Sequence, residues 1–280
     1  MAQIKNITQI SYPGVRRLNE DAVCVNKSQK VFGVFDGASS LDSYLSPDKK
    51  TGAYIASHIA AGTFARVDKD LVETALKANS TIQDAHLKAH IDLAENVNRF
   101  ATTAAVVRIF EDHAELLQVG DSIVLTIHTA GHTSAPLGYH DHDLALMRKW
   151  KKLAGEGVSH IRDKINDDVI QLRKSANVSY GMINGDEKVR DFLQTTTIDL
   201  DDIAVILLIT DGLFIPKADP DAEEDWDYYG RLYLEGGLDK MYDTVCKKEN
   251  SDPELTKYPR YKLHDDASGI AITLATIDNE

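Results

Sequence analysis

The stretch that decides the fold runs from residue 31 to residue 40 and reads Val-Phe-Gly-Val-Phe-Asp-Gly-Ala-Ser-Ser. Its first five residues are largely apolar, with β-branched and aromatic members, and they predict a short buried strand. The strand stops at Asp36 and Gly37. An ionised carboxylate at the end of a buried strand is costly to desolvate unless a cation or a hydrogen-bond donor meets it. Asp-Gly is also a very common hairpin turn, so this stretch alone leaves a ligand and a plain turn both open.

The same arrangement, an apolar strand beside an acidic residue, recurs along the chain. The acids are Glu20 and Asp21 before residues 22–25, Asp36 after residues 31–35, Asp121 after residues 116–119, Asp211 after residues 203–210, and Asp265 with Asp266 before residues 270–275. Acids at five strand ends could converge on one site. Carboxylate oxygens are the ligands that suit Mg²⁺ and Mn²⁺.

Six short motifs follow one another in the sequence. They are Arg16-Arg17-Leu18-Asn19-Glu20-Asp21, Val34-Phe35-Asp36-Gly37, Ala101-Thr102-Thr103-Ala104, Val119-Gly120-Asp121-Ser122, Thr210-Asp211-Gly212 and Asp265-Asp266-Ala267-Ser268. In this order and at these spacings they resemble the successive motifs of the metal-dependent serine/threonine protein phosphatases, the type 2C family, in its bacterial form. The resemblance spans residues 16–275, nearly the whole chain.

The resemblance implies an α+β fold, a four-layer αββα sandwich of two packed antiparallel sheets flanked by helices. Close spacing of the strands expected at 101–109, 114–119 and 123–128 independently predicts antiparallel pairing. The very apolar residues 203–210 are expected to form a central strand. Helices are predicted from an N-cap at Ser46 to about residue 67, and over residues 69–96.

No linker or internal repeat divides the chain, so residues 1–280 are predicted to form a single domain. Residues 130–186 stand where the family carries a variable segment beside the site, and they are expected to form a partly helical flap. Within them, the His-Asp-His-Asp tract at 140–143 is interpreted as a solvated loop, and Trp150 is expected to turn inward. On the second predicted helix, His86 and His90 are interpreted as part of a solvated face.

By the resemblance, two Mn²⁺ or Mg²⁺ ions would bind the acids, with a third ion in some members. Asp36 would bridge the two ions, the carbonyl of Gly37 would hold one of them, and Asp211 and Asp265 would hold the other. In this scheme the ions activate a water that attacks the phosphorus of a phosphoserine or phosphothreonine in a protein. The implied activity is that of a hydrolase in signalling, a protein serine/threonine phosphatase with no further cofactor.

Four more residues complete the expected site. Arg16 stands where the family places its phosphate-binding arginine, and a planar guanidinium can hold two phosphate oxygens. Asp21, with Glu20 as its rival, would bind metal directly or through water. Asp121 either supports an additional metal ion or is an ordinary hairpin aspartate.

The chain departs from the family pattern at several positions. Many relatives carry, directly after Asp-Gly, a histidine proposed to protonate the leaving group, and here the residue is Ala38, followed by Ser39 and Ser40 instead of glycines. Ala101 and Ile123 replace a usual glycine and arginine. These departures imply slower turnover. They leave open a catalytically weak or inactive binding or regulatory module with a phosphatase fold, and a small-molecule phosphatase.

Composition and charge limit the other kinds of protein that this chain could be. The chain has 43% hydrophobic and 27% charged residues, as ordinary globular proteins do, and its net charge of −13 argues against binding nucleic acid. No apolar run is long enough for a bilayer, and no signal peptide is recognised. Cys24 and Cys246 are expected to be free thiols, which fits the cytoplasm. We therefore expect a cytoplasmic monomer whose partner is a phosphorylated protein.

Overall fold

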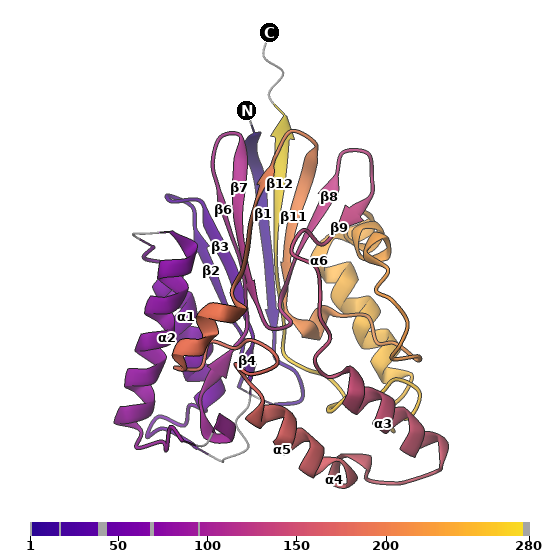
Figure 1. Ribbon diagram of the computed structural model, residues 1–280. Coiled ribbons are helices and arrows are strands. Elements are labelled where there is room, and N and C mark those ends of the chain that lie inside the picture. Colours follow the sequence, from indigo (N-terminus) through magenta and orange to yellow (C-terminus); the bar gives the residue numbers. More distant parts are fainter. Residues whose placement is uncertain (1, 17, 39–43, 68–69, 95, 277–280) are drawn as a thin grey trace.

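The computed structural model describes residues 2–16, 18–38, 44–67, 70–94 and 96–276 (Figure 1). Two five-stranded antiparallel sheets pack face to face. The first has the order β1 (Ala2–Tyr12), β12 (Ala267–Thr276), β11 (Ile203–Ile209), β8 (Ile123–His128) and β9 (Thr133–Ser134). The second has the order β10 (Gln194–Asp199), β7 (His113–Val119), β6 (Ala104–Ile109), β3 (Val31–Phe35) and β2 (Ala22–Asn26). The short strands β4 (Gly37–Ala38) and β5 (Ala101–Thr102) pair with each other.

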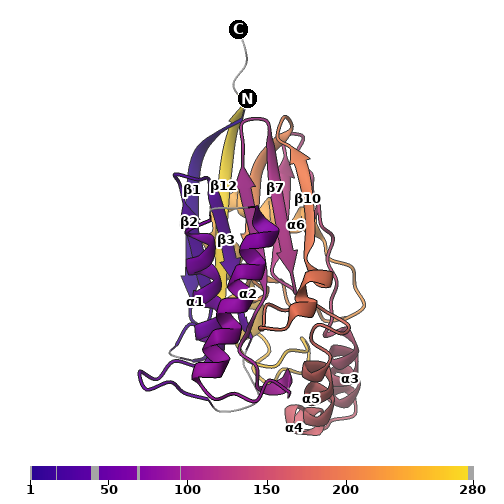
Figure 2. The ribbon, with the colours of Figure 1, turned by 60° about the vertical axis from the view of Figure 1, so that its left-hand side comes forward.

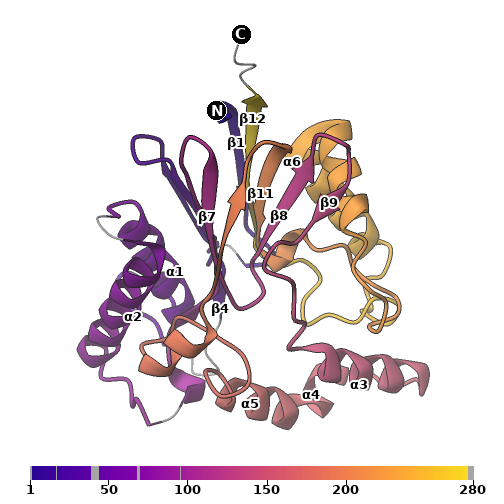
Figure 3. The same cartoon turned by 45° about the horizontal axis from the view of Figure 1, so that its top comes forward.

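Helices cover the outer face of each sheet, which confirms the predicted αββα sandwich (Figures 2 and 3). The second sheet is covered by α1 (Gly52–Phe64) and α2 (Leu71–Lys88), and the first by α6 (Trp226–Asn250). Three further helices lie at the end of the molecule opposite the termini: α3 (Leu144–Gly155), α4 (Ile161–Lys164) and α5 (Asn166–Lys174). Short 3₁₀ helices occupy Asn96–Asn98, Glu187–Phe192 and Asp211–Leu213.

The core between the sheets follows from the alternation of side chains along each strand. On β3, Phe32 and Val34 face the other sheet, whereas Val31 and Phe35 face α1 and α2. All five residues of β3 are buried because both faces of the strand are covered. The predicted central position of residues 203–210 is confirmed, since β11 pairs with β12 on one side and β8 on the other.

The predicted helix starts are partly wrong. Helix α1 begins at Gly52, and its cap is Thr51, whose Oγ1 accepts the N–H of Tyr54 at 3.2 Å. The expected cap Ser46 instead closes a turn, because its Oγ accepts the N–H of Lys50 at 2.9 Å. Helix α2 is capped by Asp70 and ends at Lys88 rather than near residue 96. Arg17, Ser39, Ser40 and Lys69 lie outside the described residues.

The three helices of residues 144–174 pack on one another and on the loop after α6, and we call residues 139–183 the flap. Trp150 turns inward as predicted: it is 3% exposed, and its indole N–H donates to the carbonyl of Leu255 at 2.7 Å. It shares a small apolar cluster with Leu146, Ile161 and Ile165. The flap therefore has a core of its own.

Among the residues that the structure describes, no helix has the length and apolar character needed to cross a bilayer.

His86 contradicts the expectation of a solvated helix face. The residue is fully buried, its Nε2 accepts the backbone N–H of Phe100 at 2.6 Å, and the two rings lie 4.7 Å apart. Burial, together with the nearby charge of Arg99, lowers the pKa of His86 to about 4. The imidazole is therefore neutral in the folded protein.

Replacement of His86 by glutamine should remove part of the protein's acid sensitivity. Between about pH 6.5 and 4 the unfolded histidine binds a proton that the buried one does not, so the free energy of unfolding falls as pH drops through this window. Between pH 7 and 5 the wild type should lose about 2 kcal/mol more than His86→Gln. Urea unfolding at both pH values measures this difference. His90→Gln is the control and should behave as the wild type, and equal losses in all three proteins would contradict the assignment.

Candidate metal centre

The register of the second sheet brings three acids to one end of the molecule. Ala22 pairs with Phe35, so Asp21, which precedes β2, and Asp36, which follows β3, lie at the same edge. Strand β6 runs antiparallel to both β3 and β7. Asp121, which follows β7, therefore comes to the same end.

The strand register of the first sheet brings two more acids to the same end of the molecule. Ile209 of β11 pairs with Gly269 of β12, so Asp211 after β11 lies near Asp265 before β12. Face-to-face packing of the sheets joins both groups into one set, which we call the acid cluster. Its members are Asp21, Asp36, Asp121, Asp211 and Asp265. The predicted convergence of these five side chains is what the structure shows.

Burial and mutual repulsion dominate the electrostatics of the acid cluster. Burial raises the pKa of Asp36 well above its usual range, and the charges of Asp21, Asp121 and Asp265 raise it further. Burial likewise raises the pKa of Asp211 well above its usual range, with further contributions from Asp36, Asp121 and Asp265. The pKa of Asp21 is raised to about 8, first by burial and then by Asp211. Such a set of carboxylates favours bound cations or protons.

Asp36 is held from its backbone. Its carbonyl accepts hydrogen bonds from Thr102 Oγ1 at 2.7 Å and from the N–H of Thr103 at 3.0 Å. Gly37 has no room for a side chain, because a Cβ there would lie 2.4 Å from the carbonyl oxygen of Glu20. The Asp-Gly pair is therefore not a hairpin turn but a tightly enclosed link between β3 and β4, which fixes the backbone of the aspartate.

Asp265 and Asp266 are adjacent but have different roles. The carboxylate of Asp266 accepts the N–H of Gly14 through Oδ1 and that of Glu20 through Oδ2, each at 2.7 Å, and so closes the loop before β2. Its own backbone lies so close to Gly212 that a Cβ on that glycine would be 2.0 Å from the Asp266 carbonyl oxygen. Asp266 thus supports the cluster, and Asp265 belongs to it.

Glu20 and Asp21 differ in their contacts. Glu20 accepts Thr51 Oγ1 at 2.6 Å and pairs with Arg16 at 3.2 Å. Asp21 accepts Thr210 Oγ1 at 2.9 Å through Oδ2. Its other oxygen, Oδ1, is buried and has no hydrogen-bond partner among the described residues. A buried carboxylate oxygen without a donor, inside the acid cluster, fits a metal ligand.

Arg16 lies at the edge of this region. Its side chain is 53% exposed, and Nη1 contacts Glu20 Oε2 at 3.2 Å. The salt bridge between them spans four residues of the loop that Asp266 closes. The guanidinium is thereby positioned beside the backbone that leads to Asp21.

Sequence reasoning missed Lys262. Its Nζ lies 2.5 Å from Asp265 Oδ1, within the acid cluster. Burial lowers the pKa of Lys262, but the charges of Asp265, Asp36 and Asp211 outweigh that effect, so the pKa is raised overall. The lysine lies in an irregular loop after α6, and no pattern in the sequence indicates that it faces the cluster. The cluster therefore contains a cation of its own.

His142 also contradicts its predicted place in a solvated loop. Its side chain is only 11% exposed and stacks on Tyr180 with ring centroids 4.2 Å apart. Its Nε2 lies 3.7 Å from Asp121 Oδ2 and 3.9 Å from Asp143 Oδ1. The flap thus places the imidazole of His142 beside the acid cluster, whereas His140 of the same tract is exposed as predicted.

Ala38 has a packing explanation. The residue is 9% exposed and lies in an apolar cluster with Ala101 and with Ala176, Tyr180 and Met182 of the flap. Where relatives carry a histidine, this chain fills the space with an apolar contact to the flap.

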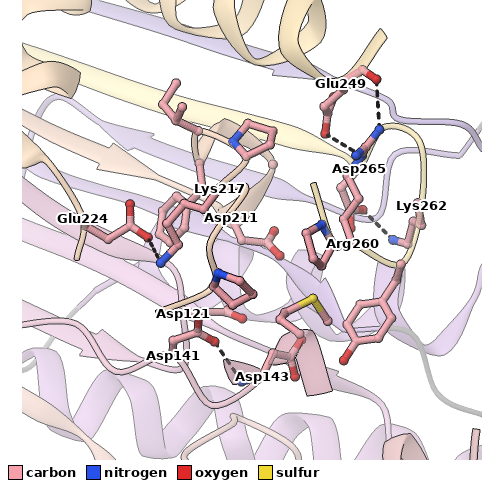
Figure 4. Close-up of a pocket in the computed structure, with 18 of the residues that line it drawn as sticks. Asp121, Asp141, Asp143, Asp211, Lys217, Glu224, Glu249, Arg260, Lys262 and Asp265 are labelled. Carbon is pink, nitrogen blue, oxygen red and sulfur yellow. Dashed lines mark hydrogen bonds and ion pairs between the residues drawn. The ribbon is translucent and has the colours of Figure 1, made fainter. Parts of the chain in front are cut away.

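A cavity of about 190 Å³ opens next to the acid cluster (Figure 4). Asp121, Asp211 and Asp265 face it on one side. The rest of its lining combines apolar side chains and two tyrosines with an ion pair of 2.8 Å between Lys217 and Glu224 and with further charged side chains. These charged residues are Asp141, Asp143, Glu249, Arg260 and Lys262. The cavity is large enough for a small polar group next to the cluster.

Comparisons with known proteins agree with this arrangement. A family profile described as "Protein phosphatase 2C" matches residues 16–240. No curated protein sequence matches the chain. Among solved structures, a bacterial serine phosphatase has a TM-score of 0.60 at 16% identity over 99% of this chain and 100% of its own.

Two further structures share the fold. The serine/threonine phosphatase Stp1 from Staphylococcus aureus has a TM-score of 0.59 at 14% identity, over 98% of this chain and 96% of its own. The catalytic domain of the serine threonine protein phosphatase PstP, crystallised with two manganese ions, has a TM-score of 0.57 at 15% identity, over 97% and 98% of the two chains.

Neutralising one member of the acid cluster should stabilise the metal-free protein. Asp36→Asn or Asp211→Asn removes a buried like charge, so at pH 8 in chelator we expect the melting temperature to rise by roughly 2 to 4 °C, about 1 kcal/mol. Added Mn²⁺ should then stabilise the variants less than the wild type. Asp167→Asn, on the exposed face of α5, is the control for thermal unfolding. Lower melting temperatures for both cluster variants in chelator would contradict this account.

Lys262→Met should destabilise the metal-free protein and increase its affinity for Mn²⁺. Without the ammonium group the metal-free protein loses a favourable charge and should unfold at a lower temperature. Mn²⁺ should bind more tightly, by about fivefold at low ionic strength, because Asp265 no longer shares its oxygen with Nζ. Calorimetric titration measures the affinity, with exposed Lys247→Met as the matched control. Unchanged or weaker Mn²⁺ binding in Lys262→Met would rule out this competition.

Proposed function

Because the chain belongs to the protein phosphatase 2C family, we propose that it hydrolyses phosphoserine and phosphothreonine in proteins with two divalent cations, Mn²⁺ or Mg²⁺, held by the acid cluster. The observation that carries the proposal is the convergence of five carboxylates at the ends of two packed sheets, with raised pKa values at Asp21, Asp36 and Asp211. Repulsion between these carboxylates does not stabilise the fold, whereas it does favour the binding of cations.

The proposed ligands follow from position. Asp36 lies among the other acids, and it would hold the ions together with Asp211, Asp265 and the Gly37 carbonyl. Asp21 is the fifth proposed ligand, since its Oδ1 is buried without a donor. Divalent cations in this place would supply Lewis acidity and positive charge for attack of water on phosphorus. Oxygen-only ligands fit the hard cations Mn²⁺ and Mg²⁺.

An additional ion is proposed at Asp121 rather than at Glu20. The Oδ1 of Asp121 is buried and lacks a hydrogen-bond partner among the described residues. Glu20, by contrast, is engaged by Thr51 and Arg16. Glu20 would then act by positioning the arginine.

Two positively charged side chains, Arg16 and Lys262, would contact the phosphate group of the substrate. Arg16 is half exposed at the edge of the acid cluster, and a turn of its side chain away from Glu20 would bring a planar donor to phosphate oxygens. Lys262 sits deeper, beside Asp265, and would add positive charge next to the same group. Thr102 and Thr103 hold Asp36 in place throughout.

The alternative is a catalytically weak or inactive module with a phosphatase fold. The presence of Ala38 after the Asp-Gly pair favours it. With that position filled by apolar flap contacts, slow turnover is expected. A small-molecule substrate is a further alternative, which a panel of phosphopeptides and small phosphate esters would distinguish. The cytoplasm remains the proposed location, on the grounds of two free thiols.

Hydrolysis of a simple aryl phosphate and of phosphopeptides, with and without Mn²⁺, tests the proposal. The wild type should require the ion. Asp36→Asn and Asp211→Asn should each lower kcat/KM at least about a hundredfold, roughly 2.7 kcal/mol of transition-state stabilisation. Asp167→Asn on the flap should retain wild-type activity.

Three outcomes of this experiment would lead to different conclusions about function. Activity that survives in both cluster variants would contradict the metal assignment. A folded wild type that binds Mn²⁺ yet leaves every substrate intact would support the binding module. Activity on small esters with none on phosphopeptides would support the small-molecule enzyme.

A further inference from the structure

A second group of metal-binding side chains lies at the end of α6. Cys246 and Glu249 are three residues apart on the helix, which places them on one face, and His264 from the following loop meets them there. The thiol, the carboxylate and a ring nitrogen all lie within 4.8 Å of one another. None of the three belongs to the acid cluster.

The ring of His264 is oriented by two partners. Its Nδ1 lies 2.6 Å from Glu249 Oε2, and its Nε2 lies 3.2 Å from the amide oxygen of Asn250. The ring is thereby held with Nδ1 toward the Glu249 carboxylate, where one ion would contact both groups, and with Nε2 toward the amide oxygen of Asn250. An outer contact such as that of Asn250 is also typical of histidines that bind metal.

The group is accessible and its carboxylate is not blocked. The side chain of His264 is 25% exposed, and Cys246 is half-buried, whereas Cys24 is buried inside β2. Arg260 approaches Glu249 Oε1 no closer than 4.0 Å. Its guanidinium is engaged by Asp252 at 3.0 Å and by backbone carbonyls.

We propose that Cys246, Glu249 and His264 form a binding site for Zn²⁺, with the fourth position open to water. Thiolate and imidazole ligands favour Zn²⁺ over the hard ions Mn²⁺ and Mg²⁺, which suit the all-oxygen acid cluster. Three protein ligands with one open position are a usual zinc arrangement. The ion would join the end of α6 to the loop that carries His264 and Lys262.

Cobalt provides the direct test, because Co²⁺ substitutes for Zn²⁺ and gives a charge-transfer absorption band in the near ultraviolet when a thiolate binds it. Titration of the full chain with Co²⁺ should produce this band with one ion per chain. Cys246→Ser should abolish it, and His264→Asn should weaken the affinity at least about tenfold. The matched control Cys24→Ser should keep the band. Asp36→Asn should also keep it, since the acid cluster has no thiol.

Zn²⁺ should in addition raise the melting temperature of the wild type and of Asp36→Asn by more than that of Cys246→Ser, in which only the acid cluster remains to bind the ion, with circular dichroism confirming that each variant is folded. Absence of a thiolate band in the wild type, or its persistence in Cys246→Ser, would overturn the proposal. These outcomes are independent of phosphatase activity, because none of the readouts requires turnover or the acid cluster.

Discussion

The repulsion within the acid cluster is the constraint on which the rest of the structure depends. Several buried carboxylates share one end of the molecule, and burial is the first cause of the raised pKa values of Asp21, Asp36 and Asp211. Such an arrangement persists only if the surrounding fold over-determines it. The core between the sheets supplies that rigidity, since β3 and β11 are buried almost throughout. The acids stand at the ends of these strands.

Backbone contacts transfer this rigidity from the sheets to the acids. Asp36 is held through its carbonyl by Thr102 at the end of β5 and by Thr103, which lies between β5 and β6, and Asp266 holds the loop that leads to Asp21. One carboxylate oxygen of Asp21 and one of Asp121 are left without a donor among the described residues, whereas Asp265 Oδ1 accepts from Lys262. Each acidic motif therefore consists of an aspartate together with neighbours that fix its backbone.

The strands and their acids were predictable because their signals are local. Alternation, apolar runs and Asp-Gly pairs lie within a few residues, and antiparallel register then determines which strand ends meet. Lys262 and His142 were not predictable, because each reaches the cluster from an irregular segment whose path depends on tertiary packing. The helix start at Thr51 was missed for a related reason: Thr51 also donates to Glu20, which is 31 residues away in sequence. Propensity alone favoured Ser46.

Ala38 and the flap are one structural feature rather than two. A histidine at position 38 would project into the space where Tyr180 and Met182 pack, so the small apolar residue is what permits this approach of the flap. Tyr180 in turn stacks on His142 and presents that imidazole to Asp121. The chain has thus lost an imidazole on the strand and gained one from the flap, beside the same group of acids. From sequence alone, Ala38 implies only a weaker site. In the structure Ala38 packs against the flap, and the flap places His142 beside Asp121.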